Sequence, residues 1–273
     1  MIPLFDRFKK KFAKKVFKHY GYKLVEFDLK EEGKIQFAQW LHEGELPVVI
    51  HQSTVDFYKQ FINEGSLVID IGAHTGDTTV PMALAAGKTG LTLGLEPNPH
   101  VYHVLEVNAT LNREKTNIIP LNFAATANDG EFTFASGDAS FNNGGIIGFS
   151  SNIKKNIRHT FQVQGKNLEN FLKLEYASWL SKLALIKIDA EGYDKEILKT
   201  MSIIIDNYKP VIITECFKHL TVEERSDLFR AINNHGYQLF FVDEFNRENR
   251  KPISMDGMNY RKHFDLIAIP NSK

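Results

Sequence analysis

Leu67-Val-Ile-Asp-Ile-Gly-Ala-His-Thr-Gly-Asp77 predicts a buried strand that runs into a glycine turn and then a helix. Three of its first five residues are β-branched and apolar, as a parallel strand covered on both faces requires. Gly72 lets the backbone turn sharply and approach a ligand with no Cβ in the way, and Gly76 lets the next helix start close to the strand. Asp70 stands in an apolar run, so N–H groups of the turn or a cationic ligand should compensate its charge.

The turn differs from the dinucleotide-binding fingerprint G-x-G-x-x-G. The second glycine of that fingerprint lets a pyrophosphate approach the backbone, and His74 takes its place here. The turn therefore predicts a nucleoside that has no diphosphate. S-adenosylmethionine fits, because it carries adenine, ribose and an amino-acid tail with a sulfonium. An ordinary tight strand-to-helix turn without a ligand is the alternative.

The composition is that of a globular protein. The chain has 273 residues, 43% hydrophobic and 24% charged, with a formal net charge of zero. This length favours one large domain with additions, and the neutral balance argues against a nucleic-acid partner. A single cysteine, Cys216, excludes an internal disulfide. No apolar run has the length of a signal peptide at the start or of a membrane span elsewhere, so we expect a cytoplasmic protein.

The first 20 residues are basic and amphipathic. Seven Lys or Arg side chains occur among Phe and Val residues at helical spacing. Two interpretations stay open: a helix lying on anionic lipid at the inner membrane face, and a helix packed on the domain with solvated lysines. A short strand is expected from Tyr22 to Phe27, and residues 28–52 look irregular. We therefore expect an N-terminal extension over 1–52 and the main domain over 53–273.

From residue 53 onward, apolar strands alternate with amphipathic helices. Strands are expected at 66–71, 91–95, 117–121, 183–188, 211–214, 237–242 and 264–269, and helices at 76–86, 99–112, 193–200 and 221–234. Two further segments, 130–137 and 160–164, alternate like half-buried antiparallel strands. Repeated β-α-β units predict an α/β fold with a doubly wound, mostly parallel sheet.

Several acidic residues end or follow predicted strands: Asp70, Glu96, Asp189 and Glu215. Because ligands of such sheets bind beyond the carboxyl ends of the strands, these carboxylates should crowd one ligand-binding rim. Glu96 can accept hydrogen bonds from both hydroxyls of a ribose, which we favour over a surface carboxylate. The small side chains of Ala124 and Ala125 leave room either for adenine or for ordinary close packing.

A second motif, Leu185-Ile-Lys-Ile-Asp-Ala-Glu-Gly-Tyr193, is a strand with a carboxylate-rich exit. Alternation places Lys187 and Asp189 on one side of the strand, where a structural ion pair is the favoured interpretation of Lys187. Asp189 and Glu191 then lie at the exit. Paired carboxylates there can coordinate a cation, orient a substrate hydroxyl or remove its proton.

Two residues after the next strand extend this site. Glu215 could supply a third oxygen ligand beside Asp189 and Glu191 if a divalent cation such as Mg²⁺ is bound. His219 is a candidate base, although a lone histidine is more often structural or exposed. The chain alone leaves the metal and the identity of the base open.

The chain resembles the FkbM-type S-adenosylmethionine-dependent methyltransferases. The resemblance lies in Val68–Asp77, in Leu95-Glu-Pro-Asn-Pro99 and, most specifically, in Leu185–Tyr193. It implies a Rossmann-like class I methyltransferase fold with seven strands, the last antiparallel, and methyl transfer to an oxygen, often a sugar or polyketide hydroxyl. It implies cofactor binding at Asp70, Gly72, Gly76 and Glu96, and an active-site edge at Asp189 and Glu191.

The expected function is therefore S-adenosylmethionine-dependent O-methylation of a hydroxyl, with a sugar of a polysaccharide, glycolipid or natural product as acceptor. The full expected cofactor site comprises Asp70, Gly72, His74, Gly76, Glu96, Asn98, Ala124 and Ala125, and the catalytic candidates are Asp189, Glu191 and His219. A non-catalytic, nucleoside-binding scaffold at the membrane is the alternative. His74 disfavours a third reading, a nicotinamide-dependent oxidoreductase. The oligomeric state is not readable from the chain.

Overall fold

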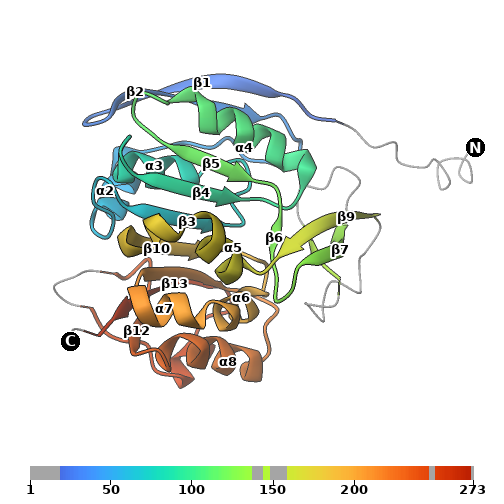
Figure 1. Cartoon of the computed structure of the whole chain (residues 1–273), viewed down its shortest axis with the longest axis vertical. Helices are drawn as coiled ribbons and strands as arrows, with labels where there is room; N and C mark the ends of the chain where they lie inside the picture. The colour runs from blue at the N-terminus through green and yellow to red at the C-terminus, as the bar shows by residue number, and fades with distance from the viewer. Residues whose placement is uncertain (1–18, 137–143, 148–158, 246–249, 272–273) are drawn as a thin grey trace, which may run out of the picture.

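The computed structural model describes residues 19–136, 144–147, 159–245 and 250–271 (Figure 1). The basic helix expected over residues 1–20 lies outside this part except for its last two positions, so the helix and its membrane contact stay predictions. The division of the chain at residue 52 also stays a prediction. In the described residues, no helix is long and apolar enough to cross a membrane.

A seven-stranded sheet forms the centre of the molecule (Figure 1). In spatial order its strands are β12 (Tyr237–Phe241), β13 (Phe264–Pro270), β11 (Val211–Cys216), β10 (Leu183–Ile188), β3 (Leu67–Ile71), β4 (Leu91–Leu95) and β5 (Ile118–Leu121). The strands from β11 to β5 pair in parallel, and β13 runs antiparallel to both of its neighbours. The predicted doubly wound sheet with an antiparallel last strand is confirmed.

Helices cover both faces of this sheet. They are α2 (Gln52–Lys59), α3 (Thr79–Ala86), α4 (Pro99–Leu111), α5 (Leu168–Glu175), α6 (Asp194–Thr200), α7 (Ser202–Tyr208) and α8 (Val222–Asn233), with short 3-10 turns η2 (Ala177–Lys182) and η3 (Asp256–Asn259). Successive residues of β3 enter different apolar clusters: Leu67 and Ile69 belong to one, and Val68 to the other. This alternation is expected of a strand buried on both faces.

Helix α3 begins at Thr79, three residues later than the predicted start at residue 76. The intervening residues form turns instead. The hydroxyls of Thr78 and Thr79 both donate to the Asp70 carboxylate, at 2.9 and 2.6 Å. The carboxylate on β3 thus holds the chain in a wide turn before the helix starts.

A smaller four-stranded sheet is inserted after β5. It contains β6 (Ala124–Ala125), β7 (Gly130–Ser136), β8 (Gly144–Ile146) and β9 (His159–Lys166), in the order β6-β9-β7-β8. Strands β7 and β9 pair antiparallel, as predicted from their alternating sequences. In Figure 1 this sheet lies to the right of the central one, next to the strand ends that form the site described below.

The expectation that residues 28–52 are irregular is wrong for residues 28–40 and is confirmed for residues 41–51. Strands β1 (Tyr22–Leu29) and β2 (Gly33–Trp40) form an antiparallel hairpin whose turn ends at Gly33, with φ of 67°. Ile35 and Phe37 on β2 are buried against the central domain. Their spacing of two residues was the available signal, but the charged residues and glycines around them concealed it.

Two asparagines of α4 bind the outer edge of β2. Asn108 accepts from the Ala38 N–H at 2.6 Å and donates to the Ala38 carbonyl at 3.2 Å, and Asn112 makes the same two bonds to Gln36 at 2.9 Å each. Four residues of helix rise about 6 Å and two residues of strand about 7 Å, so the two spacings match. The side chains of the helix therefore take the place of a third strand and fix the hairpin to the domain.

We expect Asn108→Ala to lower the free energy of unfolding more than Asn112→Ala. Both substitutions leave backbone groups of β2 without partners, buried at Ala38 and only partly buried at Gln36. Loss of a buried partner costs about 1–3 kcal/mol, and Asn108 also donates to the Thr75 carbonyl at 2.7 Å. Urea denaturation measures the difference. Thr110→Ala, a change at an exposed residue of the same helix, is the control. Equal losses of unfolding free energy in all three variants would contradict the role of the two asparagines at the edge of β2.

Candidate functional site

Backbone hydrogen bonds join the carboxyl ends of three neighbouring strands. The N–H groups of Gly72 and Ala73 donate to the Leu95 carbonyl at 3.0 and 2.9 Å, and the Asp189 N–H donates to the Ile71 carbonyl at 2.9 Å. Gly72 has a φ of 79°, and a Cβ at this position would lie 2.0 Å from the Asp189 carbonyl oxygen. Only glycine allows the two loops to approach so closely.

A cavity of about 350 Å³ opens beside these strand ends. This size is within the range of small-molecule sites. The predicted site residues that line it are Gly72, His74, Glu96, Asn98, Ala124, Ala125, Asp189 and Glu191. Those that do not line it are Asp70, Gly76, Glu215 and His219. The structure thus gathers most of the predicted cofactor residues around one cavity.

Glu96 lies in the cavity wall with both carboxylate oxygens facing the loops. One oxygen accepts the His74 N–H at 3.0 Å, and the other accepts the Asn98 N–H at 2.8 Å. Burial raises the pKa of Glu96, while the nearby His74 and these two N–H groups oppose that rise. Each oxygen keeps a free acceptor direction, so the carboxylate is oriented to receive two further hydrogen bonds.

Asn98 has a structural task as well as a place in the wall. It is the N-cap residue of α4, and its side chain accepts the His100 N–H at 3.0 Å. The cap fixes where α4 begins and holds the backbone that donates to Glu96.

His74 is held from outside the central domain. Its backbone has a φ of 47°, an uncommon value for a residue with a side chain. Its Nε2 lies 3.5 Å from Glu45 Oε1, and its ring meets the Trp40 ring edge-on at 5.8 Å. Glu45 also lines the cavity. Sequence reasoning missed Glu45 because it lies in a segment with no strand, helix or motif around it.

Asp70 and Gly76 build the site from behind. Asp70 is fully buried away from the cavity, where it binds the two threonine hydroxyls and lies 3.6 Å from Lys187 Nζ. A Cβ at Gly76 would lie 3.1 Å from Leu105 Cδ1, so this glycine allows the loop to pack against α4. Both residues shape the loop, and neither lines the cavity.

Part of the cavity wall is apolar. Phe123, Ala124 and Ala125 after β5 contribute to it, together with Phe134 and Ile146 from the smaller sheet. Phe134 and Ile146 were not predicted, because the pairing of β7 with β8 and β9 brings them there from a different sheet.

The cavity wall also carries the carboxylates of Asp189 and Glu191. The Asp189 side chain is 47% exposed and accepts a hydrogen bond from Lys187 Nζ at 3.4 Å. Glu191 has a φ of 51°, which turns the chain sharply. Burial and the Asp189 charge raise the pKa of Glu191. These two carboxylates can accept hydrogen bonds or a proton from a ligand.

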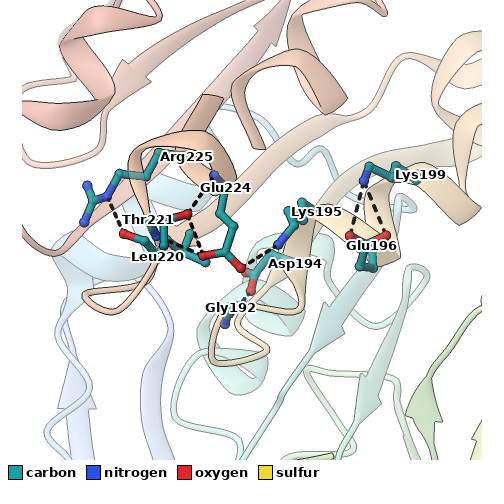
Figure 2. Close-up of polar contacts among 9 residues, drawn as sticks. All are labelled: Gly192, Asp194, Lys195, Glu196, Lys199, Leu220, Thr221, Glu224 and Arg225. Atoms are coloured by element: carbon teal, nitrogen blue, oxygen red, sulfur yellow. Dashed lines mark hydrogen bonds and ion pairs between the residues drawn. The ribbon is translucent and has the colours of Figure 1, made fainter. Parts of the chain in front are cut away.

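Asp194, which sequence reasoning missed, holds this turn in place. Figure 2 shows its carboxylate against Gly192, whose N–H donates to it at 3.2 Å. The Thr214 hydroxyl donates to its other oxygen at 2.9 Å. Nearby, Lys195 of α6 meets Glu224 of α8 at 3.4 Å (Figure 2). These contacts join the turn after β10 to the helices that follow.

Two candidates from sequence lie outside the cavity. Glu215 meets His263 at 3.3 Å, and the His219 ring packs against Phe217 at 5.2 Å. Within the described residues, no three His, Cys, Asp or Glu side chains are placed to hold a metal ion. The structure therefore does not bring Asp189, Glu191 and Glu215 together as a ligand set.

Comparison with solved structures gives similar folds at low identity. They include a precorrin-6y C5,15-methyltransferase from Geobacter metallireducens GS-15 (13% identity, TM-score 0.43, covering 82% of this chain and 90% of that one). A SAM-dependent O-methyltransferase from Thermotoga maritima is 11% identical, with a TM-score of 0.42 and coverage of 93% and 79%. An FkbM methyltransferase from Methylobacillus flagellatus KT is 14% identical, with a TM-score of 0.43 and coverage of 80% and 51%.

Family membership rests on the sequence rather than on these likenesses. A search of curated proteins finds no match. The family model described as the methyltransferase FkbM domain matches residues 70–239, more than half of the chain. This range begins at Asp70 on β3 and includes every strand end that borders the cavity. The chain belongs to the FkbM family of S-adenosylmethionine-dependent methyltransferases.

Proposed function

We propose that this protein transfers a methyl group from S-adenosylmethionine to a hydroxyl, and that the acceptor is a sugar in a polysaccharide, glycolipid or natural product. The observation that carries the proposal is a cavity whose wall combines apolar side chains with the carboxylates of Glu96, Asp189 and Glu191. A hydroxyl acceptor needs oxygen atoms that orient it and accept its proton, and Asp189 and Glu191 can supply them.

The residues that line the cavity suggest one orientation for the cofactor. Glu96 would receive the two ribose hydroxyls at the acceptor directions left by His74 and Asn98. Ala124, Ala125 and the apolar side chains around them would enclose the adenine ring. The amino-acid tail would then pass the close contact at Gly72, toward Lys187 and Asp189.

The bound cofactor supplies an activated methyl group on a sulfonium. The main task of the chain is then to hold the acceptor oxygen in line with the breaking S–C bond, an effect worth about 7–11 kcal/mol in well-oriented systems. We assign proton removal to Asp189, which adds about 10²–10⁴-fold. It lines the cavity and is exposed at its mouth, whereas His219 does not line it.

Glu215 is a poorer candidate base than Asp189 because of its protonation state. Burial and the charges of Asp189, Asp194 and Glu191 raise the pKa of Glu215 to about 9. At neutral pH it holds a proton and is uncharged. One of its oxygens is buried without a hydrogen-bond partner among the described residues, which also favours the neutral form.

The remaining partners of the site are proposals of the same kind. The basic N-terminal segment would bring the protein to the inner face of a membrane, where glycolipid acceptors lie. The formal net charge of the whole chain is zero, which argues against a nucleic-acid partner. A nucleoside-binding scaffold without turnover is the competing function, and a protein that binds the cofactor yet methylates no acceptor would support it.

An acceptor screen tests the reaction. We expect methylated product from a hydroxyl-bearing saccharide or glycolipid and none from amine or carboxylate analogues, detected as added methyl mass with the bond assigned by NMR. Asp189→Asn should lower the turnover number about 10²–10⁴-fold. N-methylated product, or full turnover by Asp189→Asn, would contradict the proposal.

Glu96→Gln tests the cofactor orientation. The amide keeps the shape of the side chain but accepts at one oxygen only, so the affinity for S-adenosylhomocysteine should fall about 10- to 100-fold. Isothermal titration calorimetry measures the loss. Glu64→Gln, a change at an exposed carboxylate, is the control. Unchanged affinity in Glu96→Gln would place the ribose elsewhere.

The Glu215 carboxyl should make stability pH-dependent. Its folded pKa of about 9 lies above the ordinary value of 4.5. The stability it contributes is therefore fully present below the ordinary pKa and is lost as the pH rises toward about 9. Between these limits the free energy of unfolding should fall more in the wild type than in Glu215→Gln. Urea denaturation across this range measures it, with exposed Glu223→Gln as control; parallel curves for wild type and Glu215→Gln would refute the shift.

A further inference from the structure

Lys187 is the cationic side chain of an otherwise acidic cavity. Among the described lining residues it is the one Lys or Arg, and five carboxylates share the wall with it: Glu45, Asp77, Glu96, Asp189 and Glu191. S-adenosylmethionine carries a sulfonium and an ammonium, which such a wall favours, but it also carries a carboxylate. That carboxylate would be repelled everywhere in the wall except near a cation or backbone N–H groups.

The contacts of Lys187 leave donors of its ammonium available for a ligand. Its Nζ lies 3.6 Å from Asp70 Oδ1, too far for a hydrogen bond, and 3.4 Å from Asp189 Oδ2. An ammonium has three donors. Among the described residues, the Lys187 ammonium has one hydrogen-bond partner, Asp189. The Lys187 side chain is 12% exposed and reaches the cavity wall.

Lys187 stays protonated and positively charged in this environment. Burial lowers the pKa of Lys187, but the charges of Asp70 and Asp189 raise it by more, so the net shift is upward. Register supports the arrangement, because Lys187 of β10 lies directly beside Asp70 of β3. Lys187 is therefore a permanent donor and not a base for the acceptor.

We propose that Lys187 binds the carboxylate of the methionine part of S-adenosylmethionine, with Asp70 and Asp189 holding its ammonium in position. The proposal rests on the cofactor orientation given under the proposed function. It assigns Lys187 a binding role beyond the structural ion pair with Asp70. The two roles differ in one respect: only a binding role makes affinity depend on the carboxylate of the ligand.

The test compares two ligands that differ in this carboxylate alone. They are S-adenosylhomocysteine and S-adenosyl-3-thiopropylamine, which has hydrogen in place of the carboxylate. Calorimetric titration of the full chain should show that the wild type prefers S-adenosylhomocysteine by roughly tenfold or more, the usual worth of a charge-assisted contact. A wild type without this preference would overturn the proposal.

The decisive variant is the double substitution Asp70→Asn with Lys187→Met, which removes the ammonium without leaving a buried unpaired carboxylate. It should lose the preference for S-adenosylhomocysteine over the amine ligand. Lys218→Met, the same change at a lysine outside the cavity wall, should keep the preference. If the double variant does not fold, as judged by thermal unfolding without ligand, Lys187→Gln gives the same comparison.

The remaining outcomes separate the two proposals. A double variant that keeps the wild-type preference overturns the role of Lys187 and leaves the cofactor orientation intact. Equal weakening of both ligands assigns Lys187 a structural role only and also overturns the proposal. If the wild type binds neither ligand, the cofactor orientation itself fails, and the binding role of Lys187 fails with it.

Discussion

The close approach of the loop after β3 to the loop after β10 is the constraint on which the site depends. The Asp189 N–H donates to Ile71, and a Cβ at Gly72 would lie 2.0 Å from the Asp189 carbonyl. The same turn donates to Leu95 on β4. Three strand ends are thereby held at one level, and the cavity forms where their loops diverge. Moving any one of these loops outward would separate Glu96 from Asp189 and Glu191.

Buried charge is the second constraint, and the chain meets it with neighbours that also position the site. Asp70 is fully buried, and it is stabilised by two threonine hydroxyls and Lys187. The threonine contacts also tie the start of α3 to β3. Glu96 is buried as well, and the two N–H groups that stabilise it orient it toward the cavity. Stability and ligand geometry therefore share the same hydrogen bonds.

Elements with a strong local pattern were predicted well. Strands β4 and β10 begin and end where the apolar runs do, and α4 begins at Pro99 as expected. The hairpin of β1 and β2 was only half predicted. The spacing of Ile35 and Phe37 was a weak local signal for β2, and distant side chains complete its edge: Asn108 in α4 and Asn112 at the C-terminal end of that helix.

The sequence by itself determined the α/β class, the glycine turn after β3 and the family, because apolar periodicity and the motifs around Gly72, Glu96 and Asp189 are local properties of the chain. Tertiary structure alone decided which of these residues face the cavity. It placed Asp70 behind the wall, kept His219 and Glu215 away from it, and brought in Glu45. The physical reason is that facing and burial depend on strand order, register and loop packing, which join residues distant in sequence.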